Sequence, residues 1–144
     1  MATTTASDRK TPWHLWVVGI LTLLWNGSGA ATIMLAQGGR MPNLSPDEAA
    51  YYAAQPTWFV IATDIALVSA IAAGVALLRR SRTAVWFFGL SLAVILFNNG
   101  YELVAGTSRM LANRGALIVT LVIAVIAILQ LVYARAMSRR AALK

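Results

Sequence analysis

The stretch FVIATDIALVSAIAAGVALL, residues 59–78, decides the fold class, because it is apolar throughout except for a few small polar residues and one carboxylate, Asp64. A helix rises about 1.5 Å per residue, so about 20 residues cross the roughly 30 Å hydrocarbon core of a bilayer. No proline interrupts this run. It therefore predicts a membrane-spanning helix with an aspartate in apolar surroundings.

Three further apolar blocks of similar length flank this stretch. The chain is 59% hydrophobic and 12% charged, with a mean hydropathy of +0.69, which is far from the average for soluble domains. The blocks lack the alternating pattern of barrel strands, so helices are the expected way to satisfy the backbone in lipid. We expect an all-α polytopic membrane protein, a single domain with an up-down-up-down bundle of four transmembrane helices. The expected helices cover residues 13–36, 57–79, 84–106 and 116–137.

Basic residues gather beside one set of predicted helix ends, and this placement predicts the topology. One side carries Arg9, Lys10, Arg79, Arg80, Arg82, Arg135, Arg139, Arg140 and Lys144. The other side carries only Arg40, Arg109 and Arg114. Positive residues favour the cytoplasmic side, so we expect an inner-membrane protein with both termini in the cytoplasm. Their position at helix ends, rather than on one polar face, excludes nucleic acid as the expected partner.

The long first loop, residues 38–56, predicts a short helix of its own. Ser45 is a suitable N-cap, Pro46 suits the first helical position, and Glu48 stands where it can close a capping box. Pro56 ends this segment before the next membrane helix. We expect an amphipathic helix over residues 46–54 that rests on the outer membrane surface. A structured connector is the simplest interpretation, and a lid over a site or a docking surface are the alternatives.

Several polar residues interrupt the apolar helices and are candidates for binding. Ser91, Asn98 and Glu102 are spaced by seven and four residues, which places them on one helical face. Asn26 and Asp64 are expected at the level of Asn98, in the outer third of the bilayer. Polar groups at such depths usually face protein or water and are functional candidates. These five residues form the candidate polar layer for a small, unidentified solute.

Asp64 has three possible roles: binding a solute or proton, structural hydrogen bonding to Asn26 or Asn98, and contact with another subunit. A helical wheel places Asp64 opposite a face of small residues. That small-residue face comprises Ala62, Ala66, Ser69, Ala70 and Ala73. If the small face packs inside the bundle, Asp64 faces lipid or a second protein. If the bulky face packs inside, Asp64 joins the asparagines.

Catalytic and metal chemistry have little support in the sequence. There is no cysteine, and the one histidine, His14, is expected to be an interfacial residue beside two tryptophans. No phosphate-binding glycine loop, nucleophile motif or pair of carboxylates at helical spacing is present. We therefore expect no catalytic residues, metal or cofactor, and a protein that is not an enzyme.

Three segments resemble a group of small four-helix inner-membrane proteins of proteobacteria, some of which carry a sugar-transporter label. The segments are PWHLWVVGILTLLWNGSGA (residues 12–30), SPDEAAYY (residues 45–52) and LLRRSRTAVWFFGLSL (residues 77–92). The resemblance implies a membrane module with transport-like or accessory function, and it assigns no functional residues. Asp64 departs from the apolar second helix of that group. The partners we expect are the lipid bilayer and either a homo-oligomer or a larger membrane complex.

Overall fold

The computed structural model describes residues 12–106, 114–140 and 142–143, and the regular elements in these ranges are all helices. The four long helices are α1 Trp13–Gln37, α3 Thr57–Leu78, α4 Thr83–Ala105 and α5 Arg114–Arg139. The short helix α2 covers Pro46–Ala53. Each long helix contains a segment long and apolar enough to cross a membrane, which confirms the expected all-helical class and the presence of four helices that could span a bilayer. Their ends lie within two residues of the expected positions.

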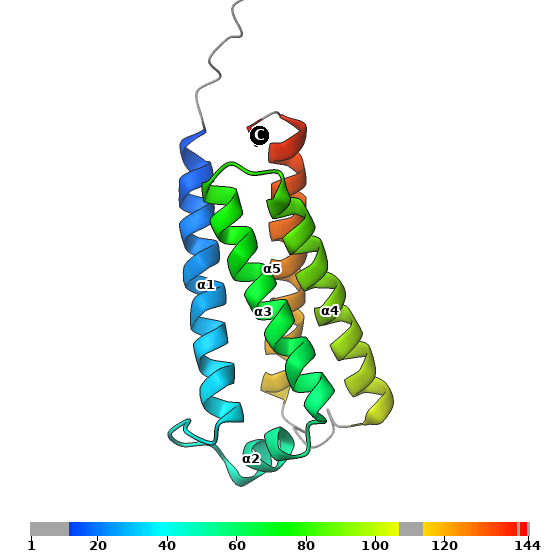
Figure 1. Cartoon of the computed structure of the whole chain (residues 1–144). Coiled ribbons are helices and arrows are strands. Elements are labelled where there is room, and N and C mark those ends of the chain that lie inside the picture. Colours follow the sequence, from blue (N-terminus) through cyan, green and yellow to red (C-terminus); the bar gives the residue numbers. More distant parts are fainter. Residues whose placement is uncertain (1–11, 107–113, 141, 144) are drawn as a thin grey trace, which may run out of the picture.

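The long helices lie side by side, and α2 sits at the end of the bundle away from the C-terminus (Figure 1). Helix α3 packs against both α1 and α4, and α5 packs against α4. Helix α3 is thus the central element, and the orientation of its side chains decides which polar residues face the interior.

The small-residue face of α3 is the face that packs inside the bundle. Ala66, Ser69, Ala70 and Ala73 are all buried. Next to them, Gly74 lets α1 approach closely, since a Cβ at this position would lie 2.8 Å from Leu23 Cδ2. Small residues at helix contacts allow backbones in membranes to come together. Of the two arrangements that the helical wheel allows, the structure therefore has the one in which the small-residue face packs inside the bundle.

The outer surfaces of the long helices are strongly apolar. Large exposed side chains include Leu24 on α1, Val68 on α3, Trp86 on α4 and Leu129 on α5, with exposed fractions from 61% to 81%. Soluble monomers rarely leave such extensive apolar surface in water. In a bilayer these side chains lie against acyl chains, so the surface agrees with an integral membrane protein.

The C-terminal residues close the bundle at the end where α3 turns into α4. Leu143 is almost completely buried, with 1% exposure, in a cluster with Leu15, Leu77 and Phe88. The Nε atoms of two arginines in the α3–α4 link donate to carbonyls of this segment. Arg80 Nε lies 3.2 Å from the Ala142 oxygen and Arg82 Nε 3.4 Å from the Leu143 oxygen. These bonds satisfy backbone carbonyls beyond the end of α5.

Helix α2 begins with the capping box that the sequence predicts. The Ser45 hydroxyl accepts a hydrogen bond from the Glu48 backbone N–H at 3.3 Å, and the Ser45 N–H donates to Glu48 Oε2 at 2.9 Å. The Ser45 backbone N–H and the Ser45 hydroxyl, which donates to Glu48 Oε2 at 2.8 Å, lower the pKa of the Glu48 carboxyl below its usual value. The capping box and Pro46 together fix where α2 starts.

Candidate functional site

Asn98 forms the one polar contact between α3 and α4 that lies deep in the described part of the bundle. Its side chain is buried, and Nδ2 donates to Thr63 Oγ1 at 3.0 Å. The Thr63 hydroxyl in turn donates to the Phe59 carbonyl at 2.9 Å. Asn98 Oδ1 is buried and has no hydrogen-bond partner among the described residues. Thr63 was not among the candidates from the sequence. The feature that could have identified it is its position beside Asp64 in an otherwise apolar run.

Asp64 lies on the opposite, outward side of α3 from the small-residue face. It lines a shallow, open hollow of about 280 Å³ together with Ile61, Ile65, Val68 and Ser69, all from α3. The exposed fractions of Ile61, Ile65 and Val68 are 53%, 46% and 66%. One carboxylate oxygen, Oδ1, is covered and has no hydrogen-bond partner among the residues described. Asp64 thus combines an unsatisfied polar atom with an apolar outer surface.

Asn26 does not join Asp64 and Asn98 in one layer. The close approach of α1 and α3 places Thr22 and Leu23 beside Gly74, with the two helices antiparallel. Continuing this register places Asn26 opposite about Ile71, seven residues and about 10 Å along the axis from Asp64. Asn26 instead donates through Nδ2 to the Thr22 carbonyl of its own helix at 2.8 Å.

The expected stripe on α4 faces neighbouring elements rather than lipid. Ser91 is buried, with 3% exposure, and Asn98 bonds to α3. Glu102, one turn beyond Asn98, accepts a hydrogen bond from the hydroxyl of Tyr51 in α2. Asn98, Asp64 and Glu102 therefore lie in three separate environments: the Thr63–Asn98 pair, the open face around Asp64, and the Tyr51–Glu102 contact.

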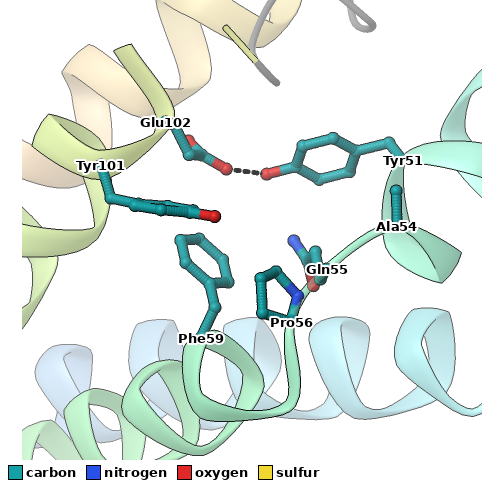
Figure 2. A pocket seen from close by; sticks show the side chains of 7 residues that line it. All are labelled: Tyr51, Ala54, Gln55, Pro56, Phe59, Tyr101 and Glu102. Atoms are coloured by element: carbon teal, nitrogen blue, oxygen red, sulfur yellow. Dashed lines mark hydrogen bonds between the residues drawn. The ribbon is translucent and has the colours of Figure 1, made fainter. Parts of the chain in front are cut away.

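The Tyr51–Glu102 contact belongs to a small pocket between α2, α3 and α4. Figure 2 shows Glu102 and Tyr101 reaching in from α4, with Phe59 and Pro56 on the opposite side. We call this the outer pocket, and its lining consists of Tyr51, Ala54, Gln55, Pro56, Phe59, Tyr101 and Glu102. Its volume of about 10 Å³ is at the threshold for holding one water molecule.

The environment of the outer pocket keeps Tyr51 protonated. Burial raises the pKa of the Tyr51 hydroxyl far above its usual value of 10.0, and the hydrogen bond to Glu102 and the carboxylate charge raise it further. The hydroxyl therefore remains a donor to Glu102 at every physiological pH. This contact ties the loop helix α2 to the end of α4.

His14 lies at the opposite end of the bundle, where its Nδ1 is 2.6 Å from the Tyr133 hydroxyl of α5. The His14 and Tyr133 rings also meet edge to face, with centroids 5.9 Å apart. This contact joins α1 to α5 near their ends. No group of three or more metal-ligating side chains occurs among the residues that the structure describes.

No family model, curated protein or solved structure matches the chain.

Proposed function

We propose that this chain is a non-enzymatic accessory module of the bacterial inner membrane, built to contact another membrane-spanning chain through α3. Its four long helices cross the bilayer up and down with both termini in the cytoplasm, in keeping with the basic residues near that side. The short helix α2 then rests on the outer surface, where Tyr51 and Tyr52 lie at the headgroup level.

The observation that carries this proposal is the position of Asp64 on the exposed face of α3. A carboxylate facing lipid is costly, by about 2.5–3.5 kcal/mol at a helix centre and less near the interface. Ile61, Ile65 and Val68 around it offer an apolar contact area, and Oδ1 has no partner among the described residues. A second protein on this face would replace the lipid contact with protein contacts.

A second copy of the same chain fits this face best. In its neutral form a carboxyl group has one donor and spare acceptor capacity, so two such groups can satisfy each other across a two-fold axis. Residues Ile61, Ile65 and Val68 follow a helical spacing of four and three, which makes a continuous strip for helix pairing. The proposed contact is therefore self-complementary.

Transport by a single copy has less support from the geometry. Such transport requires a polar path that connects the candidate residues, yet Asn26, Asp64 and Asn98 face three different environments. The outer pocket has room for about one water molecule. A solute path would therefore have to form between copies. Both a transport function and an accessory function thus require oligomerisation.

Cysteine cross-linking in native membranes tests the contact, and the natural absence of cysteine makes it direct. We expect single substitutions Ile65→Cys and Val68→Cys to form disulfide-linked dimers under mild oxidation, because a disulfide requires Cα atoms within about 7 Å. The matched controls are Leu121→Cys and Val125→Cys, which are similarly exposed on α5, at 58% and 53%.

Preferential dimer formation at the α3 positions would support the proposal. Equal cross-linking on α3 and α5 would indicate random collision, and the absence of α3 dimers would rule out a second copy on this face.

A further inference from the structure

The outer pocket concentrates hydrogen-bond acceptors at the level of the lipid headgroups. Glu102 lies three residues before the end of α4, and Phe59 lies two residues after the start of α3. The pocket is therefore within about one helical turn of the ends of both spanning helices. Tyr101 and Trp58, whose ring centroids are 4.7 Å apart, occupy the same level, as expected for an interfacial aromatic belt.

The chemistry of the pocket is that of a cation site. Glu102 provides a carboxylate, and only one of its oxygens accepts from Tyr51. The rings of Tyr101 and Phe59 are tilted by 44° with centroids 5.8 Å apart, and both residues line the same space. Aromatic faces and a carboxylate attract a positive charge together, because both present negative potential.

Gln55 supplies a further acceptor. Its Oε1 is buried and has no hydrogen-bond partner among the described residues. In Figure 2 the amide nitrogen is on the side nearer to Tyr51 and Tyr101. Rotation of the terminal amide about its soft last torsion exchanges the nitrogen and oxygen. It gives up the contact of the amide nitrogen with the Tyr51 hydroxyl and turns the unsatisfied acceptor toward the pocket. The site thus has an acceptor that a donating ligand would satisfy.

The size of the pocket limits the ligand. About 10 Å³ accommodates a body the size of one water molecule. A primary ammonium head is of that size and carries three N–H donors, as in a lysine side chain. A trimethylammonium head is larger and has no donor to offer Glu102 or Gln55.

We propose that the outer pocket binds a primary ammonium group, presented by an ethanolamine lipid headgroup or by a small free amine. The ammonium donates to the unused oxygen of Glu102 and to Gln55 Oε1, and it lies against the rings of Tyr101 and Phe59. Tyr51 orients the carboxylate through its hydrogen bond to the other oxygen. The site does not depend on the proposed contact at Asp64.

Thermal unfolding of the full chain in nanodiscs tests the site. A ligand that binds only the folded state raises the midpoint of unfolding. We expect a higher midpoint in discs of phosphatidylethanolamine mixed with phosphatidylcholine than in phosphatidylcholine alone, at a constant fraction of anionic lipid. In phosphatidylcholine discs, methylammonium chloride is added and compared with tetramethylammonium chloride at equal ionic strength.

Stabilisation by ethanolamine lipid alone identifies a headgroup site, and stabilisation by methylammonium as well identifies a site open to free amines. Glu102→Gln should abolish either effect and reduce retention of ethanolamine lipid in native mass spectrometry by about tenfold, the factor for one charge-assisted hydrogen bond. Asp47→Asn, which removes an exposed carboxylate of α2 outside the pocket, should retain both effects. Equal midpoints in all lipids and amines, or an unchanged response in Glu102→Gln, would overturn the proposal.

Discussion

Thr63 and Asp64 are neighbours in the chain, yet they face different surroundings. Thr63 bonds to the buried Asn98 of α4, whereas Asp64 stands on the exposed side of α3. Consecutive residues on a helix are separated by about 100°, so one can serve the interior and the next the surface. At the residue scale, the polar groups of α3 therefore face two ways: Thr63 bonds to α4, and Asp64 stands on the face that we propose for contact with a second copy.

The Thr63–Asn98 hydrogen bond should show energetic coupling in a double-mutant cycle. We expect the losses in unfolding free energy caused by Thr63→Val and Asn98→Leu to be less than additive. The expected coupling energy is about 0.6–1.7 kcal/mol, the range for hydrogen bonds between membrane helices. Unfolding in mixed micelles measures the free energies. Thr32→Val is the matched control, because Thr32 bonds only to the Ser28 carbonyl of its own helix. A coupling energy between Thr32 and Asn98 as large as that between Thr63 and Asn98 would contradict the Thr63–Asn98 hydrogen bond.

Tyr51 gives the fold an alkaline pH dependence with a defined sign. Its folded pKa is raised above the usual 10.0, mainly by burial, so the folded state holds its proton more tightly than the unfolded state. The stabilisation is fully present below pH 10 and declines as the pH rises from there toward the folded pKa. Tyrosinate absorbance during an alkaline titration should show one late-titrating group fewer in Tyr51→Phe than in the wild type, while Tyr52, whose pKa is also raised by burial, titrates late in both. A wild-type titration identical to that of the variant would refute this prediction.

At the element scale, the contact between α1 and α3 depends on glycine. A Cβ at Gly74 would lie 2.8 Å from Leu23 Cδ2 and 3.3 Å from Thr22 Cγ2, so even one methyl group forces the Leu23 side chain to move or the helices to separate. Contacts this tight are destabilising when atoms are added to a packed interface.

Gly74→Ala should therefore lower the free energy of unfolding by about 1–3 kcal/mol. Gly100→Ala is the matched control, because Gly100 is exposed on α4 and an added Cβ there meets nothing within 4 Å. We expect that control to be neutral or slightly stabilising, since alanine has the higher helix propensity. Denaturant titration in micelles compares the two, and equal effects would contradict the close approach of α1 to α3.

The helices themselves were predictable from local signals, but their mutual placement was not. Apolar length identified the four spanning segments, and the spacing of Ser45, Pro46 and Glu48 located the start of α2. The register of α1 against α3 depends on the complementary shapes of Gly74 and Leu23, which no hydropathy pattern encodes. For this reason Asn26 was expected at the level of Asp64 and is found about 10 Å away along the helix axis.

The outer pocket is a second case in which the sequence did not predict a contact between elements. Glu102 was a candidate because it extends the polar stripe of α4, whereas Tyr51 lies in the loop helix, which was expected to rest on the outer membrane surface. Their contact joins residues 51 positions apart. A single sequence gives no signal for such a pairing, because it arises from the way in which α2 folds over the ends of α3 and α4.

At the scale of the whole molecule, the proposed topology places α2 outside the cell membrane and the α3–α4 link in the cytoplasm. Single cysteines at Ala49 in α2 and Thr83 at the start of α4 are both on exposed positions. In intact cells with a permeable outer envelope, a membrane-impermeant maleimide should label Ala49→Cys and leave Thr83→Cys unmodified until the membrane is broken. The reverse labelling would invert the topology.

We propose that the Asp64 face of α3 contacts a second copy, and the subunit number in nanodiscs measures this contact most directly. We predict that wild-type protein and Asp64→Asn, whose amide also has a donor and an acceptor, are dimeric by native mass spectrometry. Asp64→Leu should shift the population toward monomer, with a dissociation constant raised about three- to twentyfold. A wild-type protein that remains monomeric, or an Asp64→Leu variant that dimerises as tightly as wild type, would contradict the account.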